Sequence, residues 1–206
     1  MAKLNFKYAT MNSGKTLDLI RTVHNYEENE FQVLVLKPLI DTKGNNKIIS
    51  RVGLERKVDF LISEDDNLLE LLAEHLENIE CIFIDEAQFL KKKQVNELFI
   101  IAKIFNKAVI CYGLRTNFKM EAFEGSERLL ELADELEELK TICRCGEIAR
   151  YVGRKVNNRF VSDGEEVIID GTDDVEYIPL CGECYLTNVK QIDIKELKSK
   201  VKIKKR

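Results

Sequence analysis

The chain has 206 residues, of which 45% are hydrophobic and 33% are charged, and its net charge is −4. This length and composition fit one domain with a substantial hydrophobic core and a small second unit. The acidic balance argues against a protein whose main partner is nucleic acid, because nucleic-acid-binding surfaces are usually strongly basic.

The start of the chain and its cysteines predict the compartment. Residues 1–4 lead directly into the first predicted strand without a long apolar stretch, and we expect no signal peptide. No apolar run reaches membrane-spanning length, so we expect no membrane partner. We therefore predict a cytoplasmic protein, in which the six cysteines stay reduced and serve as metal ligands or core residues.

A loop of small residues follows the first predicted strand, which covers residues 4–8, and it ends in Gly14-Lys15-Thr16. Residues 16–23 then have apolar side chains at helical spacing. Strand, loop and helix in this order are typical of a P-loop, in which backbone N–H groups at a helix N-terminus bind phosphate. Lys15 would add a mobile positive charge, and the Thr16 hydroxyl would be a ligand for Mg²⁺.

The loop departs from the P-loop pattern at one position. The motif has a glycine five residues before Gly14, where this chain has Ala9. Alanine lacks the freedom of glycine at positive φ, so the loop has to start from an ordinary backbone conformation. The alternative to a P-loop is a strand-to-helix turn with an exposed lysine.

Further strands and helices alternate along the next part of the chain. We predict a polar loop at residues 40–54, strands at 31–38, 57–62, 81–84, 108–113 and 139–142, and helices at 65–76, capped by Ser63, at 95–105 and at 125–136. The strands are almost continuous apolar runs, which indicates an α/β fold with a parallel sheet and helices on both faces. Ligands of such sheets bind at the carboxyl ends of strands, which is where Gly14, Asp85 and Gly113 fall.

Two adjacent acidic residues, Asp85 and Glu86, end the predicted strand at residues 81–84. Phosphoryl transfer needs Mg²⁺ and usually a carboxylate on the strand beside the P-loop strand, and we expect Asp85 to hold the metal from that position. Glu86 lies where the strand gives way to a loop, and it is placed to accept the proton of a substrate hydroxyl. The alternative is a solvated acidic pair that closes a strand. His24 and His75 fall on predicted helices away from these loops, and we expect neither to be catalytic.

The character of the sequence changes after residue 142. Residues 143–190 are rich in glycine, acidic turns and short β-like runs, and they contain four of the six cysteines. We therefore predict a P-loop domain at residues 1–140, a zinc-binding domain that carries a lid at 141–192, and a basic C-terminal tail at 193–206.

Two close cysteine pairs, Cys143–Cys145 and Cys181–Cys184, predict a structural metal site. Four thiolates suit tetrahedral Zn²⁺, and a closed set of four leaves no open position for catalysis. The alternatives are a redox pair and unliganded thiols. A small polar region has too little core to fold alone, and metal binding would supply its stability. The other two cysteines fall in apolar strands and are predicted core residues.

The chain between the two cysteine pairs is predicted to contain a β-hairpin. Its strands would be residues 159–161 and 166–169, with Asp163-Gly164 in the turn. A flexible hairpin, clamped at its base by a metal, would suit a lid over an active site.

These motifs together resemble those of the type II thymidine kinases, the cytosolic zinc-containing family, and its bacterial branch in particular. The resemblance covers nearly the whole chain, in order, and rests on residues 11–16, 85–89 and 112–118 and on the two cysteine pairs. It implies transfer of the γ-phosphate of ATP, with Mg²⁺, to the 5′-hydroxyl of thymidine or deoxyuridine, which gives dTMP in pyrimidine salvage. It also implies a homotetramer with structural Zn²⁺ and with dTTP as feedback inhibitor, and no nucleic-acid or membrane partner.

The resemblance further implies roles for individual residues. Glu86 matches the general base, and Thr16 and Asp85 match the magnesium ligands. The ATP site would consist of Ala9, Thr10, Met11, Asn12, Ser13, Gly14, Lys15, Thr16, Asp85, Glu86, Ala87 and Gln88. The substrate site would consist of Met11, Phe89, Leu114, Phe118, Phe123, Val152, Glu166, Val167, Ile168, Ile169, Asp170 and Tyr177.

Within the implied substrate site, Phe118 matches the aromatic residue that packs on the thymine ring. The methyl group of thymine would lie against residues such as Met11 and Leu114. Backbone groups of residues 166–170 would read the edge of the base, and Tyr177 would lie near the deoxyribose.

Two positions depart from the family pattern. The chain has Lys43 where the family has arginine, which keeps the positive charge but loses the bidentate fork of a guanidinium group. It has Asp170 where the lid of the family has glycine.

Two other classes of protein compete with the kinase hypothesis. One is a P-loop ATPase whose zinc finger binds nucleic acid or a partner protein. The acidic balance and the absence of basic and aromatic stripes around the cysteines argue against it. The other is a zinc-stabilised nucleotide-binding protein without catalysis.

Overall fold

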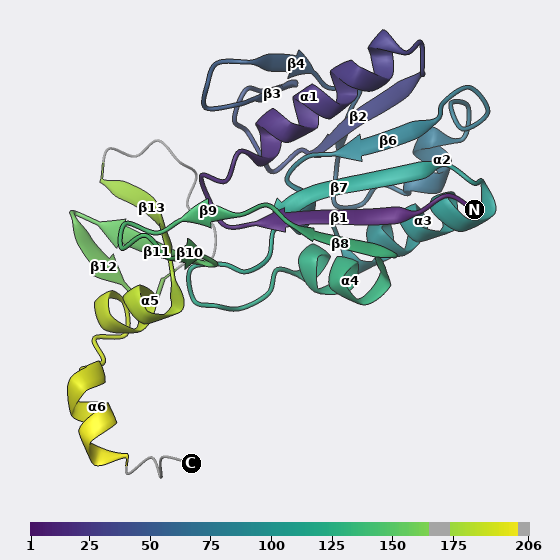
Figure 1. Ribbon diagram of the computed structural model, residues 1–206. Coiled ribbons are helices and arrows are strands. Elements are labelled where there is room, and N and C mark those ends of the chain that lie inside the picture. Colours follow the sequence, from purple (N-terminus) through teal and green to yellow (C-terminus); the bar gives the residue numbers. More distant parts are fainter. Residues whose placement is uncertain (165–173, 202–206) are drawn as a thin grey trace.

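Six parallel strands form the central sheet of the computed structural model, which describes residues 1–164 and 174–201 (Figure 1). Across the sheet the order is β5 (Phe60–Ile62), β2 (Val33–Pro38), β6 (Cys81–Ile84), β7 (Ala108–Leu114), β1 (Leu4–Ala9) and β8 (Glu135–Glu138). Every neighbouring pair is parallel. Strand β7 therefore lies between β1 and β6, and the prediction that residues 81–84 lie beside the first strand is wrong.

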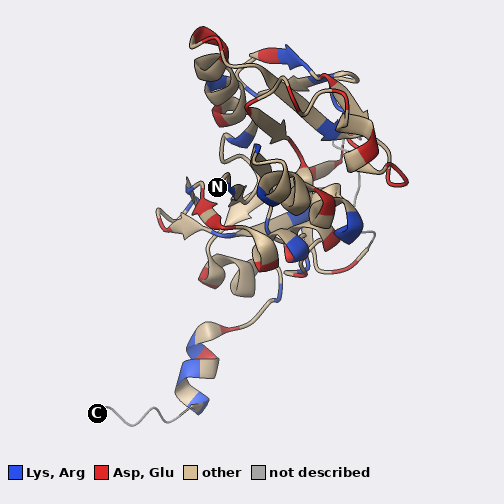
Figure 2. Cartoon of the chain, turned by 90° about the vertical axis from the view of Figure 1, so that its right-hand side faces the viewer, with Lys and Arg blue, Asp and Glu red and all other residues tan. Residues whose placement is uncertain are grey.

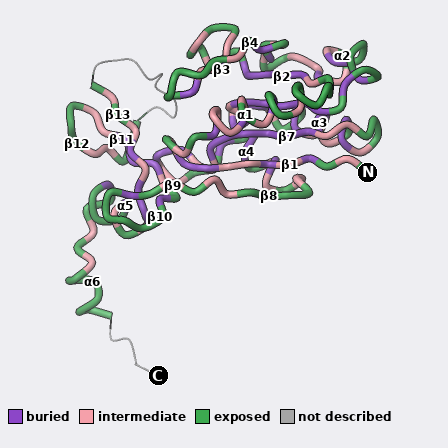
Figure 3. Tube along the Cα trace, turned by 45° about the horizontal axis from the view of Figure 1, so that its top comes forward, coloured by how far each residue is buried: buried purple, intermediate pink, exposed green. Residues whose placement is uncertain are grey.

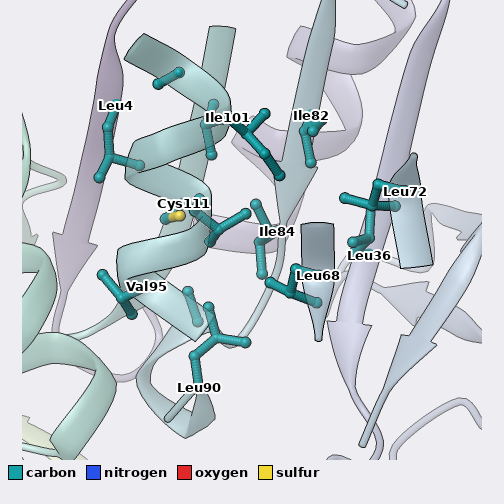
Figure 4. Packing of buried hydrophobic residues seen from close by; sticks show 14 of the residues in the cluster. Leu4, Leu36, Leu68, Leu72, Ile82, Ile84, Leu90, Val95, Ile101 and Cys111 are labelled. Atoms are coloured by element: carbon teal, nitrogen blue, oxygen red, sulfur yellow. The ribbon is translucent and has the colours of Figure 1, made fainter. Parts of the chain in front are cut away.

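Helices cover both faces of this sheet, as predicted. Helix α1 (Lys15–Glu28) packs on one face, while α2 (Leu68–Leu72), α3 (Lys92–Ile104) and α4 (Glu124–Leu132) lie on the other. Successive strand residues point to opposite faces, so one strand can supply side chains to both cores. In β2, for example, Leu34 and Leu36 belong to the core under α3, and Val35 belongs to the core under α1. Figure 4 shows the first of these cores.

The predicted helix at residues 125–136 is too long. Helix α4 ends at Leu132, and Glu135–Glu138 instead form β8, which pairs with β1 as the edge strand of the sheet. The backbone N–H of Asp134 donates to the carbonyl of Leu4 at 2.8 Å, so the chain turns into the sheet at this point. Pairing with a distant strand overrides the helical periodicity of the sequence. The predicted strand at 139–142 is also wrong, because only Thr141–Ile142 form a strand, β9, outside the main sheet.

The region between β2 and β6 differs from the prediction in two ways: it contains two additional strands, and its helix is shorter. The predicted loop at 40–54 contains β3 (Lys47–Ile49), which forms an antiparallel pair with β4 (Glu55–Lys57). The helix predicted at 65–76 is the short α2, and its cap is Asn67 rather than Ser63. The side-chain oxygen of Asn67 accepts hydrogen bonds from two backbone N–H groups at 3.0 and 3.3 Å.

A smaller unit lies at the carboxyl ends of the parallel strands (Figure 1). Its elements are β9 (Thr141–Ile142), β10 (Ile148–Ala149), β11 (Tyr151–Val156), β12 (Arg159–Val161), β13 (Val175–Leu180) and α5 (Gly182–Asn188). Strand β12 pairs with β11 through a two-residue turn, Asn157-Asn158, in which both residues have positive φ. The second strand of the hairpin predicted at 159–169 falls outside the described residues.

The C-terminal segment contains a helix that was not predicted. Helix α6 (Ile194–Lys200) begins after Asp193, whose carboxylate accepts hydrogen bonds from the N–H groups of Lys195 and Glu196 at 2.9 and 3.0 Å. None of its residues is buried, and it extends away from the rest of the chain (Figure 3). Figure 2 shows basic and acidic residues interspersed over the side in view. None of the helices in the described ranges has the length and apolar character that a membrane-spanning helix needs.

Candidate functional site

The predicted phosphate loop lies between the end of β1 and the first turn of α1. Helix α1 begins at Lys15, and Asn12 and Gly14 have φ angles of 62° and 80°, which turn the chain sharply into the helix. Glycine adopts such an angle without steric cost. The Ser13 hydroxyl is buried and has no hydrogen-bond partner among the described residues. A buried, unpaired hydroxyl beside a helix N-terminus fits a phosphate site, because the hydroxyl could donate a hydrogen bond to a phosphate oxygen.

Lys15 and Thr16 start the helix and face the acidic end of β6. The Lys15 Nζ atom donates to the carbonyl of Thr10 at 3.2 Å, and burial lowers the pKa of its ammonium group while Glu86 and Asp85 oppose that shift. The Thr16 hydroxyl donates to Oδ2 of Asp85 at 3.1 Å. The two residues meet although β7 separates β1, which precedes the phosphate loop, from β6, which precedes Asp85. A hydroxyl and a carboxylate in this position fit the ligands of a nucleotide-bound Mg²⁺ ion.

Asp85 is a buried carboxylate, with 3% of its surface exposed. Its Oδ1 atom accepts a hydrogen bond from the N–H of Glu86 at 3.0 Å. Burial, followed by the charge of Glu86, raises the pKa of Asp85 to about 7. A divalent cation at this point would favour the ionised carboxylate and would therefore oppose the effect of burial on its pKa.

Gln88 fixes the side chain of Glu86. It belongs to a short 3₁₀ helix, Ala87–Phe89, that starts after Glu86, whose φ of 50° lies in the left-handed region. The Gln88 Nε2 atom donates to Oε2 of Glu86 at 2.5 Å, and its Oε1 atom accepts the N–H of Leu114 at 3.0 Å. One amide therefore ties the loop after β6 to the end of β7. A non-glycine residue in this backbone region costs about 1–3 kcal/mol and persists where its surroundings hold it.

A cavity of about 350 Å³ opens beside these groups. Its lining combines the polar phosphate loop and Glu86 with an apolar wall. The wall consists of Phe89, Leu114, Phe118, Phe123, Val152 and Tyr177. Phe89 and Phe123 meet edge to face, with their ring centroids 5.7 Å apart. Such a lining suits a small molecule that has a flat, weakly polar part and a charged or hydroxylated end.

Residues 40–43 and 49–52 form a third part of the lining. They bring the positive charges of Arg51 and Lys43 to the cavity, and both charges contribute to the lowered pKa of Lys15. A group of cations around a helix N-terminus is suited to a polyphosphate. The family pattern in the sequence pointed to Lys43, whereas no sequence pattern pointed to residues 49–52.

Lys37, near the end of β2, holds this loop in place through hydrogen bonds. The side chain is fully buried, and its Nζ atom donates to the Asp41 carboxylate at 3.0 Å and to the carbonyls of Lys43 and Lys47 at 2.6 and 3.3 Å. A buried ammonium group requires such partners, because burying it unpaired costs several kcal/mol or more. A lysine inside an otherwise apolar strand is a signal that could have indicated an ordered loop, although only a polar loop at residues 40–54 was predicted.

Several contacts join the smaller unit to residues around the cavity, among them two hydrogen bonds. The Thr10 hydroxyl donates to the carbonyl of Tyr151 at 3.1 Å, directly before Val152, which lines the cavity. The hydroxyl of the fully buried Tyr185, on α5, donates to the carbonyl of Phe118 at 2.6 Å. Phe118 and Val152 are thus held by contacts between segments that are far apart in the sequence.

Four cysteines of the smaller unit form a cluster. The sulfur atoms of Cys143, Cys145, Cys181 and Cys184 all lie within 4.8 Å of one another, with those of Cys145 and Cys181 3.6 Å apart. Thiolates around a tetrahedral Zn²⁺ ion, at about 2.3 Å each, lie roughly 3.8 Å from one another, so the cluster fits such an ion. The one-residue spacing of the first pair does not prevent this arrangement. The described residues therefore include a set of four thiols that could hold zinc, as predicted.

Comparison with known protein families decides where the chain belongs. A family model described as "Thymidine kinase" matches residues 2–185. The chain belongs to the thymidine kinase family.

Relatives named "Thymidine kinase" match over most of their length. A thymidine kinase of Mannheimia succiniciproducens is 45% identical over 186 residues, covering 88% of this chain and 93% of that protein. A thymidine kinase of Haemophilus influenzae is 42% identical over 196 residues, covering 93% of this chain and 100% of its own. A thymidine kinase of enterobacteria phage T4 is 42% identical over 185 residues, covering 88% of this chain and 94% of that protein. Among solved structures, a Pif1 helicase from Candida albicans gives a TM-score of 0.42 at 14% identity over 69% of this chain and 37% of that chain, which supports no inference.

Against this family background, the residues predicted for the two sites divide into four groups. Those that line one cavity are Met11, Asn12, Ser13, Gly14, Lys15, Thr16, Glu86, Gln88, Phe89, Leu114, Phe118, Phe123, Val152 and Tyr177. Ala9, Thr10 and Asp85 are buried and do not line the cavity, whereas Ala87 packs in the core on the α3 face. Glu166, Val167, Ile168, Ile169 and Asp170 lie outside the described residues.

The two histidines and the two remaining cysteines lie away from the cavity lining. His24 is exposed on α1, and His75, in a turn after α2 rather than in a helix, packs edge to face against Phe60. Cys81 and Cys111 are fully buried in β6 and β7, as predicted for core residues.

Proposed function

We propose that the protein is a thymidine kinase that transfers the γ-phosphate of ATP to the 5′-hydroxyl of thymidine, and also of deoxyuridine, to give dTMP for pyrimidine salvage. The observation that carries this proposal is the shared cavity, in which the phosphate loop, Glu86 and an apolar wall meet. A kinase must hold a triphosphate and a nucleoside side by side, and the family membership names the nucleoside.

In this proposal, the phosphate loop binds the triphosphate of ATP. Backbone N–H groups at the start of α1, the Ser13 hydroxyl and the Lys15 ammonium group would surround its phosphates. Thr16 and Asp85 would hold Mg²⁺, which neutralises charge on the transferring phosphoryl group when it is bound. Arg51 and Lys43 would add positive charge from the facing loop.

Glu86 acts as the general base in the proposed mechanism. Its carboxylate lines the cavity beside the phosphate loop, and Gln88 holds one oxygen at 2.5 Å. The other oxygen is then available to accept the proton of the 5′-hydroxyl as that oxygen attacks the γ-phosphorus. Positioning matters most for such a transfer, since the attacking and leaving oxygens have to lie in line.

The apolar wall selects the base. Phe118 would pack on the thymine ring, and Met11, Leu114 and Val152 would border its methyl group. A methyl group in such a pocket is worth only about 1–3 kcal/mol, so acceptance of deoxyuridine is expected. Backbone groups of residues 166–170, which lie outside the described residues, would complete the proposed site together with Tyr177.

The same cavity suggests how the end product would inhibit the enzyme. dTTP carries both a thymine ring and a triphosphate, so it can occupy the base pocket and the phosphate loop at once and compete with both substrates.

We further propose that residues 141–192 work as a zinc-stabilised unit on a P-loop domain of residues 1–140, and that the chains form a homotetramer. Exposed apolar side chains on and just after α3, Ile100, Ile104 and Phe105, are available for contacts between chains.

The test of this function is a screen of nucleosides with ATP and Mg²⁺, read out by mass spectrometry of the products. We expect new 5′-monophosphates from thymidine and deoxyuridine, and none from adenosine or guanosine. Consumption of ATP should depend on added thymidine. Hydrolysis of ATP at the same rate without a nucleoside would instead favour a P-loop ATPase and contradict the proposal.

A further inference from the structure

A buried arginine, Arg154, stacks on the aromatic ring proposed to carry the base. Its guanidinium carbon lies 3.7 Å from the centroid of the Phe118 ring, and both residues are at most 2% exposed. Arg154 is on β11, two residues after Val152 and directly across from Tyr177 of β13. Residues opposite each other on antiparallel strands share a face, so Arg154 lies on the same face of this small sheet as Val152 and Tyr177, two cavity-lining residues.

The guanidinium group also binds the backbone just after β12. Its Nη2 atom donates to the carbonyl of Asp163 at 2.8 Å. The Asp163 carboxylate forms an ion pair with Lys119 at 3.4 Å, and Lys119 lies 5.8 Å from the same Phe118 ring. The residue after Asp163 is Gly164, at φ 122°, where a Cβ atom would lie only 2.3 Å from Nη2 of Arg154. Arg154, Phe118, Lys119 and the Asp163-Gly164 backbone therefore form one packed cluster.

The Phe118 ring has one face on this cluster. Phe118 lines the cavity, whereas Arg154 is not among the described residues that line it. The cavity is therefore bordered by the Phe118 ring and not by the guanidinium group that stacks on it. Burial strengthens the attraction between a cation and an aromatic ring, and a planar guanidinium group can stack on the ring as an ammonium group cannot.

We propose that Arg154 is a positioning residue for the nucleoside: it fixes the plane of Phe118 and locks that ring to Asp163-Gly164. The inference rests on the proposed function, because it takes Phe118 as the platform for the base. Arg154 touches neither ATP nor the phosphate loop in this scheme. Loss of its side chain should therefore weaken thymidine binding selectively.

The test compares Arg154→Met and Arg154→Lys with Lys155→Met, a control on the same strand. Lys155 lies 5.0 Å from the Phe160 ring, so the control also removes a cation from an aromatic face. We expect Arg154→Met to raise the KM and the Kd of thymidine about 30-fold, the size of a desolvated cation–π contact, with the KM of ATP unchanged within twofold. Arg154→Lys should give a smaller increase, and the control none. Thymidine binding unchanged within twofold in Arg154→Met, or equal losses for both substrates, would overturn the proposal.

A second variant keeps the test informative if Arg154→Met fails to fold. Gly164 is exposed, and Gly164→Ala adds a methyl group against Nη2 without removing the buried charge. It should also raise the Kd of thymidine and leave that of ATP unchanged, and an unchanged Kd for thymidine would count against the proposal. Calorimetric titration measures the Kd without turnover. Failure of the parent chain to phosphorylate thymidine would remove the proposed function, whereas identical binding by parent and variants would remove this inference alone.

Discussion

Asp85 is the point at which burial and charge conflict most clearly in the candidate site. Its pKa is raised to about 7, first by burial and then by the neighbouring Glu86. A carboxyl group with a raised pKa binds protons more tightly in the folded chain than in the unfolded one. Its contribution to stability is therefore complete below the ordinary pKa near 4 and is lost as the pH rises to about 7. Ionised Asp85 destabilises the metal-free protein.

Asp85→Asn should remove this pH-dependent loss. We expect the melting temperature of the variant, relative to the parent protein, to rise as the pH is increased from about 4 to about 7 and then to level off. Differential scanning calorimetry without nucleotide or Mg²⁺ measures the difference, and Asp65→Asn at an exposed site is the control. A difference in melting temperature that does not vary with pH would show that Asp85 titrates normally. The same variant should lose kinase activity, because it lacks the proposed metal ligand.

Several site residues could be predicted from sequence because their chemistry is local. Gly14 and Thr16 follow from the strand-loop-helix pattern, and Glu86 follows from an acidic pair that ends an apolar strand. Arg51 could not be predicted in this way. It lines the cavity at the end of a loop that the buried Lys37 bonds at residues 41, 43 and 47, and such contacts between separate residues are not visible in a local sequence pattern.

Helix α5 links the cysteine cluster to the proposed base pocket. It begins after Cys181, contains Cys184, and carries Tyr185, whose hydroxyl donates to the carbonyl of Phe118. The small core of this unit consists of a few residues packed around the thiols, among them Ile178 and Leu180. So small a core contributes little stability by itself, and zinc binding would provide most of it.

Zinc removal should therefore act on one substrate more than on the other. We expect about one zinc per chain in the purified protein, measured by inductively coupled plasma mass spectrometry. Chelation, or Cys145→Ser, should lower the melting temperature and abolish thymidine binding, while ATP still binds at the P-loop on the main sheet. Full thymidine binding by zinc-free protein would contradict this link.

Secondary-structure elements were predictable where the apolar pattern matches the local structure. Residues 81–84 and 108–113 are continuous apolar runs, and they are the central strands β6 and β7. Strand β8 was missed because its residues, Glu135-Leu136-Glu137-Glu138, form an edge strand that is mainly exposed and largely acidic. Its place is set by pairing with β1, which no local pattern contains. The hairpin of β11 and β12 had a usable signal in Asn157-Asn158, since asparagine tolerates the positive φ of such turns.

In the molecule as a whole, the smaller unit lies at the carboxyl ends of the parallel strands (Figure 1), and residues of both parts line the cavity. The change in composition after residue 142 is the basis on which we predict two units. Their docking was not predictable, because single contacts such as Thr10 to Tyr151 join residues far apart in the chain. The proposed catalytic site therefore depends on tertiary structure, although most of its residues lie in recognisable motifs.

The central claim is that Glu86 removes the proton of a thymidine hydroxyl beside ATP bound at the P-loop. Transfer of ³²P from γ-labelled ATP to thymidine by Glu86→Gln and by the parent protein, with ATP binding measured in parallel, tests this claim most directly. Loss of a general base typically costs about 10²–10⁴-fold in rate, and we predict a loss of that size with ATP binding unchanged. Transfer at the parental rate by Glu86→Gln would contradict the account.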